Sequence, residues 1–226
     1  MRIREKRRII SLLQSGGLEK TIAELRAGPG REMINPLFAG LSHHDEKIHW
    51  HAVTAMGLVV RDIADQDMEA ARVVMRRLMW SLNDESGGIG WGAPEAMAEI
   101  LANPQGLADE FAHILVAYMR EDGLYLELPQ LQRGLMWGIA RMAQTAPAYM
   151  MKWQAPSFQE PYLDSPDAVV RGLAALSLGL LKTEKALAKI QTLLGDGQQV
   201  SYFWDRQFRT ATVRELAGRA IKTMGS

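Results

Sequence analysis

One helical phrase recurs along the chain at intervals of about forty residues. It reads HWHA around Trp50 and GWGA around Trp91, and an arginine takes the place of the tryptophan in the later copies, at Arg133, Arg171 and Arg214. These positions, 50, 91, 133, 171 and 214, are 41, 42, 38 and 43 residues apart. A repeat of this length is typical of helix pairs that stack into a solenoid. We therefore expect an all-α chain of about five helix pairs.

Apolar periodicity places an amphipathic helix before the repeated phrases, in segments 65–82, 107–120 and 183–194. Each of these helices would be the first of a pair, and the repeated phrase would lie early in the second helix. Aspartates precede three of the second helices, where a capping carboxylate is expected, at Asp45, Asp84 and Asp167. Strands are not expected, because alternating β-branched runs and Asn-Gly turns are missing.

Residues 146–164 interrupt the repeat pattern. Three prolines in this stretch, Pro147, Pro156 and Pro161, permit only short helical pieces. Four aromatic residues crowd the same stretch: Tyr149, Trp153, Phe158 and Tyr162. Two interpretations are open: the rings fill the gap left by a broken first helix, or they form an exposed aromatic binding strip.

Charge and composition limit the classes of function. The 26 basic residues balance the 26 acidic ones, whereas a surface that neutralises nucleic-acid phosphates usually leaves a basic excess. The chain has no cysteine, which excludes disulfides, thiolate metal sites and cysteine nucleophiles. No apolar run approaches the length of a membrane span, and the apolar part of the basic N-terminal segment is too short for a signal peptide. We expect a cytoplasmic protein without a membrane contact.

Two phrases resemble the second helix of a HEAT repeat: DAVVRGLAALSLG at 167–179 and TVRELAGRAIKTMG at 212–225. Two others, NDESGGIGWGAPEAM at 83–97 and LQRGLMWGIARMA at 131–143, resemble an uncharacterised bacterial family of HEAT-like repeat proteins. More distantly, the chain is similar to the DNA alkylation-repeat and phycobilin-lyase HEAT-like families.

The resemblance implies a right-handed α-α superhelix, a HEAT-like solenoid, that covers most of the chain from about residue 30 onward. Because no linker or shift in composition interrupts the chain, we expect one domain over residues 1–226, with an N-terminal helical cap at 1–30 and repeats at 31–226. HEAT repeats as a class imply scaffolds and partner binding. Some HEAT-like proteins are enzymes, so each enzyme class has to be tested on the residues.

Four of the five histidines fall within nine residues: His43, His44, His49 and His51. His44 and His51 are two helical turns apart, and Asp45 and His49 are four residues apart, so either pair could share a helix face. A HEAT-like metal enzyme uses ligands from several repeats, and outside this cluster only His113 is available. A solvated helix start is therefore the preferred interpretation, and we expect neither a metal nor a cofactor.

A glycine-rich segment precedes Pro94. It contains Gly87, Gly88, Gly90 and Gly92, and glycine is costly inside a helix, about 1 kcal/mol relative to alanine. A structural kink with close helix packing and a contact with a ligand or partner both remain open. The segment is not a phosphate-binding loop, because the Lys-Ser/Thr ending is missing.

Positions four apart share a helix face, so the second helices predict polar and aromatic ridges. The residues expected to contact a partner are Trp50, Trp91, Glu95, Glu99, Arg133, Trp137 and Arg141. Tryptophan and arginine are enriched at interface hot spots, which favours a recognition surface. Pairing between arginine and glutamate of neighbouring repeats is the structural alternative.

Three functions remain open. The preferred one is a non-catalytic scaffold or adaptor that binds a protein partner through the surface of its second helices. A DNA-binding or glycosylase-like protein would use Glu95 beside Trp91, with weak nucleic-acid contact through the basic start of the chain. A lyase-type or metal-dependent enzyme would need ligands that converge from several repeats, and the sequence shows no catalytic constellation.

Overall fold

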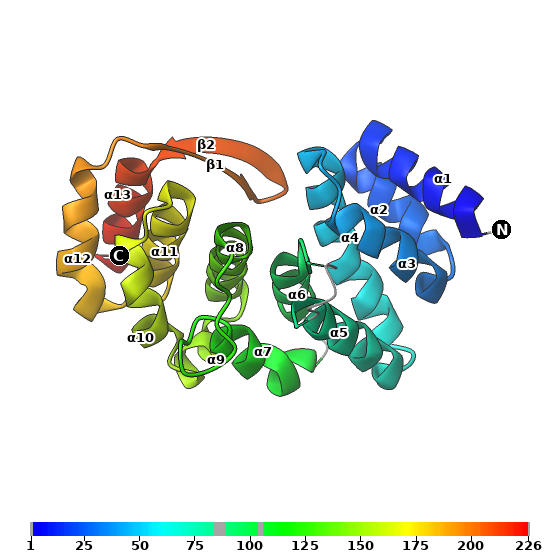
Figure 1. Cartoon of the computed structure of the whole chain (residues 1–226), viewed down its shortest axis with the longest axis horizontal. Coiled ribbons are helices and arrows are strands. Elements are labelled where there is room, and N and C mark those ends of the chain that lie inside the picture. The colour runs from blue at the N-terminus through cyan, green and yellow to red at the C-terminus, as the bar shows by residue number, and fades with distance from the viewer. Residues whose placement is uncertain (1, 84–88, 104–105, 226) are drawn as a thin grey trace. The chain divides into compact units, whose positions relative to one another are not determined.

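The structure is a computed structural model that describes residues 2–83, 89–103 and 106–225 (Figure 1). Its contacts divide the chain into two compact units, residues 1–108 and residues 109–226. The elements of the first unit are α1 (Arg2–Ser15), α2 (Leu18–Ala27), α3 (Gly30–Leu41), α4 (Glu46–Ala64), α5 (Met68–Leu82) and α6 (Ala93–Leu101), and α7 (Leu107–Ala117) begins at the boundary.

The second unit continues with more helices and one hairpin. Its elements are α8 (Pro129–Thr145), α9 (Pro147–Lys152), α10 (Ala155–Gln159), η1 (Glu160–Asp164), α11 (Ala168–Leu180), η2 (Glu184–Ala186), α12 (Leu187–Thr192), η3 (Leu193–Gly195), β1 (Gln199–Trp204), β2 (Gln207–Thr212) and α13 (Val213–Met224). In the part of the chain that the structure describes, five second helices follow five first segments, as the repeat predicts. The second helices are α4, α6, α8, α11 and α13.

In the first unit, α1 and α2 precede two helix pairs, α3–α4 and α5–α6. Asp45 caps α4 by accepting the backbone N–H groups of Lys47 and Ile48, as expected. Asp67 caps α5 in the same way through Ala70. The predicted cap at Asp84 lies outside the described residues.

Helix α4 is the buried centre of the first unit. Residues 51–60 are all buried, because α3, α5, α6 and the two N-terminal helices pack around them. His51 lies among these residues, and its Nδ1 is 2.8 Å from the carbonyl oxygen of Leu13 in α1. Burial lowers the pKa of His51, so the neutral ring that can donate to Leu13 is favoured.

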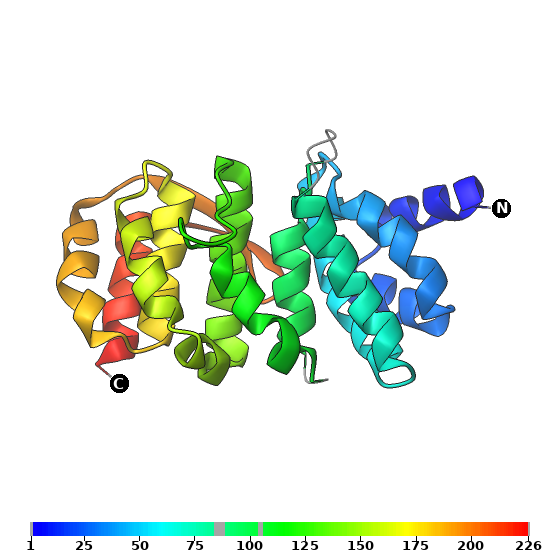
Figure 2. The same cartoon turned by 60° about the horizontal axis from the view of Figure 1, so that its bottom comes forward.

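In the second unit, α8, α11 and α13 lie side by side (Figures 1 and 2). The interrupted stretch forms the short helices α9, α10 and η1, as its prolines predict. Its aromatic residues are mostly used in packing: the Tyr162 hydroxyl donates to the carbonyl of Met119, and the Phe158 ring lies 4.9 Å below the guanidinium of Arg120. The gap-filling interpretation therefore holds for Tyr162, which is buried, whereas Phe158 is partly exposed.

The hairpin β1–β2 corrects the prediction that the chain lacks strands. Its two-residue turn consists of Asp205 and Arg206, both with positive φ, 49° and 62°. Positive φ at both positions matches the turn that hairpins prefer, but Asn-Gly is its usual sequence, so the turn went unrecognised. Val200, Tyr202 and Phe203 bury the strand against the helices. The hairpin stands between the first segment and the second helix of the last pair.

Helices α11 and α13 approach each other unusually closely. A Cβ added at Gly179 would lie 2.4 Å from the Cα of Ala220, and one added at Gly172 would lie 2.7 Å from Leu216. Both glycines are buried in α11. Glycine is therefore required at position 179 by the backbone of α13, despite its cost in helix propensity, whereas the contact at Gly172 is with the end of the Leu216 side chain.

We expect Gly179→Ala to lower the free energy of unfolding by about 1–3 kcal/mol, because the new methyl group meets the backbone of α13. Gly218→Ala, in α13, is the matched control: nothing lies within 4 Å of the added Cβ. That substitution should raise stability by up to about 1 kcal/mol through helix propensity. Chemical denaturation followed by circular dichroism measures both, and equal effects would contradict the packing argument.

Candidate functional site

In the first unit, the acidic side chain of Glu95 is buried at the contact between α4 and α6. Gly92, with φ +77°, is the N-cap residue of α6, and a Cβ on it would meet the carbonyl oxygen of Leu41 at 2.7 Å and the ring of His49 at 2.9 Å. Only glycine adopts this backbone without strain at such close quarters. The turn brings Glu95, in the first turn of α6, against the first turns of α4.

His49 and Glu95 form a pair in this junction. The Nδ1 of His49 lies 2.7 Å from the carbonyl oxygen of Leu41. The carbonyl accepts a hydrogen bond from the ring when Nδ1 carries the proton. The other ring nitrogen, Nε2, then faces Oε1 of Glu95 at 3.7 Å. Glu95 is only 8% exposed, and its Oε2 has no hydrogen-bond partner among the described residues.

Burial raises the pKa of Glu95, and the nearby His49 opposes this rise only in part. Burial therefore favours the neutral carboxyl, which avoids the cost of a buried charge, and the 3.7 Å between its Oε1 and Nε2 of His49 is longer than a hydrogen bond. A perturbed acid in this setting is a common feature of functional sites. Here, however, Oε2 is shielded from solvent. The pair can hold a proton, but it does not present an acid to a substrate in this conformation.

Three residues predicted to contact a partner are buried instead. Glu95 and Glu99 are 8% and 5% exposed, and Trp137 is 5% exposed. The Nε1 of Trp137 donates to the carbonyl oxygen of Phe203 in the hairpin, at 2.5 Å. The expectation that these residues form surface ridges is therefore wrong, because the second helices pack against their neighbours on the faces that were assigned to solvent.

The predicted arginines of the second unit form a ladder between repeats. Arg133, in α8, donates from Nε to Asp167 at 2.6 Å, and Asp167 also caps α11 through Val169 and Val170. The structural alternative of pairing between repeats is thus realised, with aspartate in place of glutamate.

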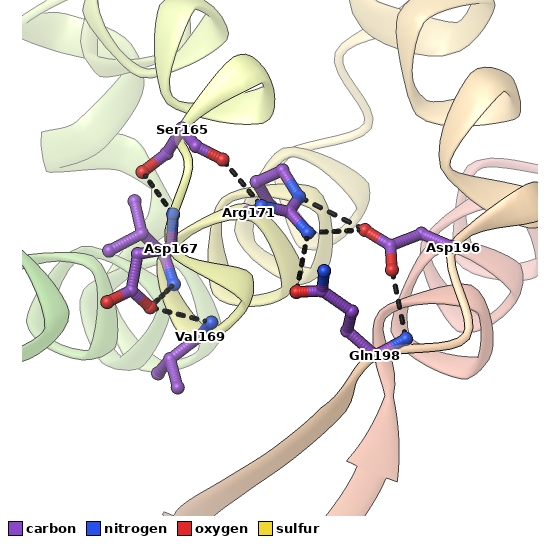
Figure 3. Close-up of polar contacts among 7 residues, drawn as sticks. Ser165, Asp167, Val169, Arg171, Asp196 and Gln198 are labelled. Atoms are coloured by element: carbon purple, nitrogen blue, oxygen red, sulfur yellow. Dashed lines mark hydrogen bonds and ion pairs between the residues drawn. The ribbon is translucent and has the colours of Figure 1, made fainter.

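Arg171, in α11, continues the ladder (Figure 3). Its guanidinium donates to Asp196 at 2.6 and 3.1 Å and to the carbonyl oxygen of Ser165 at 2.6 Å. Burial alone would raise the pKa of Asp196, but the backbone N–H of Gln198 and the charge of Arg171 hold it below its ordinary value. The carbonyl of Asp196 accepts the N–H of Arg214, which joins the ladder to α13.

The glycine-rich segment is described only in part. Gly87 and Gly88 lie outside the described residues. A Cβ on Gly90 would come within 2.8 Å of the Ser81 carbonyl, and Gly92 makes the tight turn into α6. Both described glycines thus have a packing reason, and the helix begins at Ala93, so Trp91 precedes it.

Trp50, Trp91 and Arg141 are partly exposed, so their predicted contact with a partner stays a prediction. The histidines of the cluster have separate neighbours: His43 and His44 stack on each other, while His49 and His51 contact different backbone carbonyls. Among the described residues no three His, Asp or Glu side chains are placed to hold a metal ion. No described helix is long and apolar enough to cross a membrane.

A hollow of about 360 Å³ lies between α2, α3 and α4, lined in part by Arg26, Arg31, Asp62 and Asp67. Arg26 donates to Asp62, and Arg31 pairs with Asp67. Both arginines in the hollow are therefore neutralised by partners of the chain itself.

The most exposed large apolar side chain among the described residues was not predicted. Trp80 in α5 is 77% exposed, and Val73, two turns earlier on the same helix, is 43% exposed. The sequence held the signal, because Trp80 falls off the apolar face that the periodicity of 65–82 assigns to the core.

Comparisons with known proteins identify the fold. No family model matches the chain, and no curated protein sequence matches it significantly. A designed armadillo repeat protein for modular peptide recognition is 18% identical, with 96% of this chain and 91% of that chain covered and a TM-score of 0.57. Another, in complex with the peptide (KR)4, is 18% identical over 96% and 98% of the two chains, with a TM-score of 0.53.

An engineered protein of 17% identity also matches 98% of this chain and 96% of its own, with a TM-score of 0.55. Armadillo repeats are helical repeat solenoids related to HEAT repeats. The chain has the fold of a helical repeat solenoid. No comparison identifies the bacterial HEAT-like family or the enzyme families that the sequence resembles.

The raised pKa of Glu95 predicts a pH dependence. The folded state binds this proton more tightly than the unfolded state does, so its stabilising contribution is complete below the unfolded pKa, about 4.3, and is lost as the pH rises through the folded pKa. We expect Glu95→Gln, which removes this ionisation, to gain stability relative to the natural chain as the pH rises.

Glu215→Gln serves as a control of opposite sign. The N–H and hydroxyl of Thr212 lower the pKa of Glu215, so the natural chain should gain stability over this variant as the pH rises from the folded pKa to the unfolded pKa, about 4.3, and the difference should stay constant above it. Thermal unfolding from pH 3 to 8 measures both variants. A difference at Glu95 that is constant with pH would contradict the buried-acid description.

Proposed function

We propose that this chain is a non-catalytic repeat scaffold that binds a protein partner and that the exposed face of α5 is part of the binding surface. The observation that carries the proposal is the 77% exposure of Trp80 on a helix whose opposite face is buried. A second apolar side chain, Val73, is exposed on the same side of this helix, and apolar side chains rimmed by polar residues often mark interaction sites. The structural likeness to designed peptide-recognition repeats supports the same class of function.

The α5 face, defined as Val73, Arg76, Arg77 and Trp80, follows the spacing of one side of a helix. All four residues are exposed. Tryptophan and arginine are the residue types that most often dominate binding energy at interfaces. An apolar anchor at each end, with two arginines between, suits an amphipathic segment better than an apolar one.

Arg77 is held in place before any partner arrives. Its guanidinium lies 4.3 Å from the centre of the Phe38 ring, and its Nη2 donates to the side-chain oxygen of Asn35 at 2.9 Å. Both partners belong to α3, the first helix of the preceding pair. A fixed side chain loses less conformational entropy on binding, which supports recognition.

The charge of the α5 face favours an acidic partner. Residues 72–82 contain three arginines and no acidic residue, and residues 35–42 of the adjacent helix carry no charge. Glu69 neutralises part of this charge by pairing with Arg72 and Arg76, at the far end of the helix from Trp80. The designed relative that binds (KR)4 takes a basic peptide, so the charge preference proposed here is the opposite one.

We keep as proposed contacts of the same scaffold three residues in or just before the second helices: Trp50, Trp91 and Arg141. Arg133 also remains a proposed contact, although it already pairs with Asp167. The glycosylase-like alternative loses support, because Glu95 is shielded and Arg133 has an aspartate partner. The metal-enzyme alternative loses support for a different reason: among the described residues, no three His, Asp or Glu side chains are gathered as metal ligands.

Two tryptophans provide a matched test. We expect Trp80→Ala to change the free energy of unfolding by less than about 0.5 kcal/mol, whereas Trp137→Ala should cost about 3–5 kcal/mol because that ring is buried. Binding is measured by fluorescence polarisation with a labelled amphipathic helical peptide of leucine and glutamate. Trp80→Ala should weaken this binding at least tenfold, a loss of about 1.4 kcal/mol.

Replacing the glutamates of the probe with lysines should abolish binding, since the α5 face is basic. Arg77→Ala should weaken binding and reduce its dependence on salt. Equal binding of both probes, or full binding by Trp80→Ala, would contradict the assignment of this face. A large loss of stability in Trp80→Ala would show that the ring serves packing.

A further inference from the structure

The hairpin leaves one strand edge unpaired. The register pairs Trp204 with Gln207, Phe203 with Phe208, Tyr202 with Arg209 and Ser201 with Thr210. In a hairpin with a two-residue turn, the pair that flanks the turn is hydrogen-bonded, and bonded and non-bonded pairs then alternate. The backbone groups of Phe208 and Thr210 therefore point away from β1.

Two observed bonds confirm this alternation. Phe203 belongs to a non-bonded pair, and its carbonyl points outward to accept the indole N–H of Trp137. Thr212, the partner of Gln199, likewise turns its N–H outward, to the Glu215 carboxylate. The same rule applied to Phe208 and Thr210 leaves their N–H and C=O groups facing out from β2.

The two edges of the hairpin differ in their hydrogen-bond partners. Trp137 of α8 covers the β1 edge at Phe203. On the β2 edge, no backbone hydrogen bond of Phe208 or Thr210 to a neighbouring element is found among the described residues, and both side chains are exposed. Phe208 is 51% exposed, although its ring contacts that of Phe203, with 5.3 Å between centroids.

We propose that β2 accepts an extended segment of a protein partner as a third strand, with apolar and acidic residues alternating along that segment. An exposed strand edge with free backbone groups supplies the main-chain bonds of such recognition, and side chains on alternate faces supply its specificity. This site lies outside the α5 face and extends the proposed function to a second, independent surface.

The side chains of β2 determine the alternation. Phe208 and Thr210 project on one face of the hairpin and Gln207 and Arg209 on the other. A residue placed beside Phe208 is therefore apolar, and one placed beside Arg209 is acidic. Arg219, which donates to the Tyr202 hydroxyl on the face of Arg209, adds positive charge there, and Glu215 offsets part of it.

The alternative occupant is a second copy of the chain. Two β2 strands could pair in an antiparallel way through the outward backbone groups of Phe208 and Thr210. Arg209 of one strand would then lie directly opposite Arg209 of the other. Like charges that face each other across a strand pair are unfavourable. The arginine thus disfavours self-pairing and favours an acidic segment, which is how charged residues commonly protect an exposed edge.

The probe is a fluorescein-labelled eight-residue peptide of alternating valine and glutamate, and its control has lysine in place of glutamate. The natural chain should bind the glutamate peptide at least tenfold more tightly than the lysine peptide, measured by polarisation at low salt. Arg209→Glu should reverse this preference. No detectable binding of the glutamate peptide, or no change in preference, would overturn the proposal.

Thr210→Pro tests the backbone bonds. Proline there removes an outward N–H and leaves the hydrogen bonds to β1 intact, so the hairpin should persist and binding should fall at least tenfold. Thr210→Val, which keeps the N–H, should bind normally. Full binding by Thr210→Pro would overturn strand addition. If that variant loses its thermal stability, Arg209→Glu decides the question alone.

The two binding surfaces are separable. Trp80→Ala should leave the binding of the alternating peptide unchanged, so failure of the α5 proposal and failure of this one are distinguishable. Self-association that depends on concentration and disappears in Thr210→Pro would assign the edge to a second copy and overturn the acidic-segment proposal. Light scattering of the natural chain and the variant makes that measurement.

Discussion

The burial of the second helices constrains every other part of the structure. Ten consecutive residues of α4, from 51 to 60, are buried, and so is all of α6. In the second unit α11 packs so closely on α13 that Gly179 has no room for a side chain. Removing this much apolar surface from water is the main favourable contribution to folding. It also encloses several second-helix side chains that the sequence assigned to an exposed surface, among them Glu95, Glu99 and Trp137.

The polar residues of these helices consequently serve the stack. Asp167 caps α11 and binds Arg133 of the preceding repeat, so one carboxylate fixes both a helix start and its neighbour. Asp67 does the same in the first unit, where it caps α5 and pairs with Arg31. Such bonds contribute modestly to stability when exposed, and each links a second residue to a helix start.

The most exposed aromatic side chains proposed as contacts therefore lie outside the second helices. Trp80 lies on a first helix, and Phe208 lies on an inserted hairpin. The buried pair of His49 and Glu95 shows the opposite case, in which a chemically suggestive group is enclosed by the packing of α4 and α6. Exposure, more than residue type, separates a proposed contact from a structural one in this chain.

The period of about forty residues determined the helix pairs, and local sequence determined several boundaries, such as the aspartate caps at Asp45 and Asp167. Both depend on interactions over a few residues, which a sequence displays directly. The β1–β2 hairpin was missed because its Asp-Arg turn lacks the usual residues.

Which face of each second helix is buried was decided only by tertiary structure. Helical periodicity assigned Trp137 and Glu99 to ridges, but it describes one helix against one core, whereas α6 and α8 are enclosed on several sides. The pairing of Arg171 with Asp196, 25 residues later, also depends on how successive repeats stack. The period of the sequence determines which helix pairs repeat. The packing between repeats determines which side chains remain exposed to solvent.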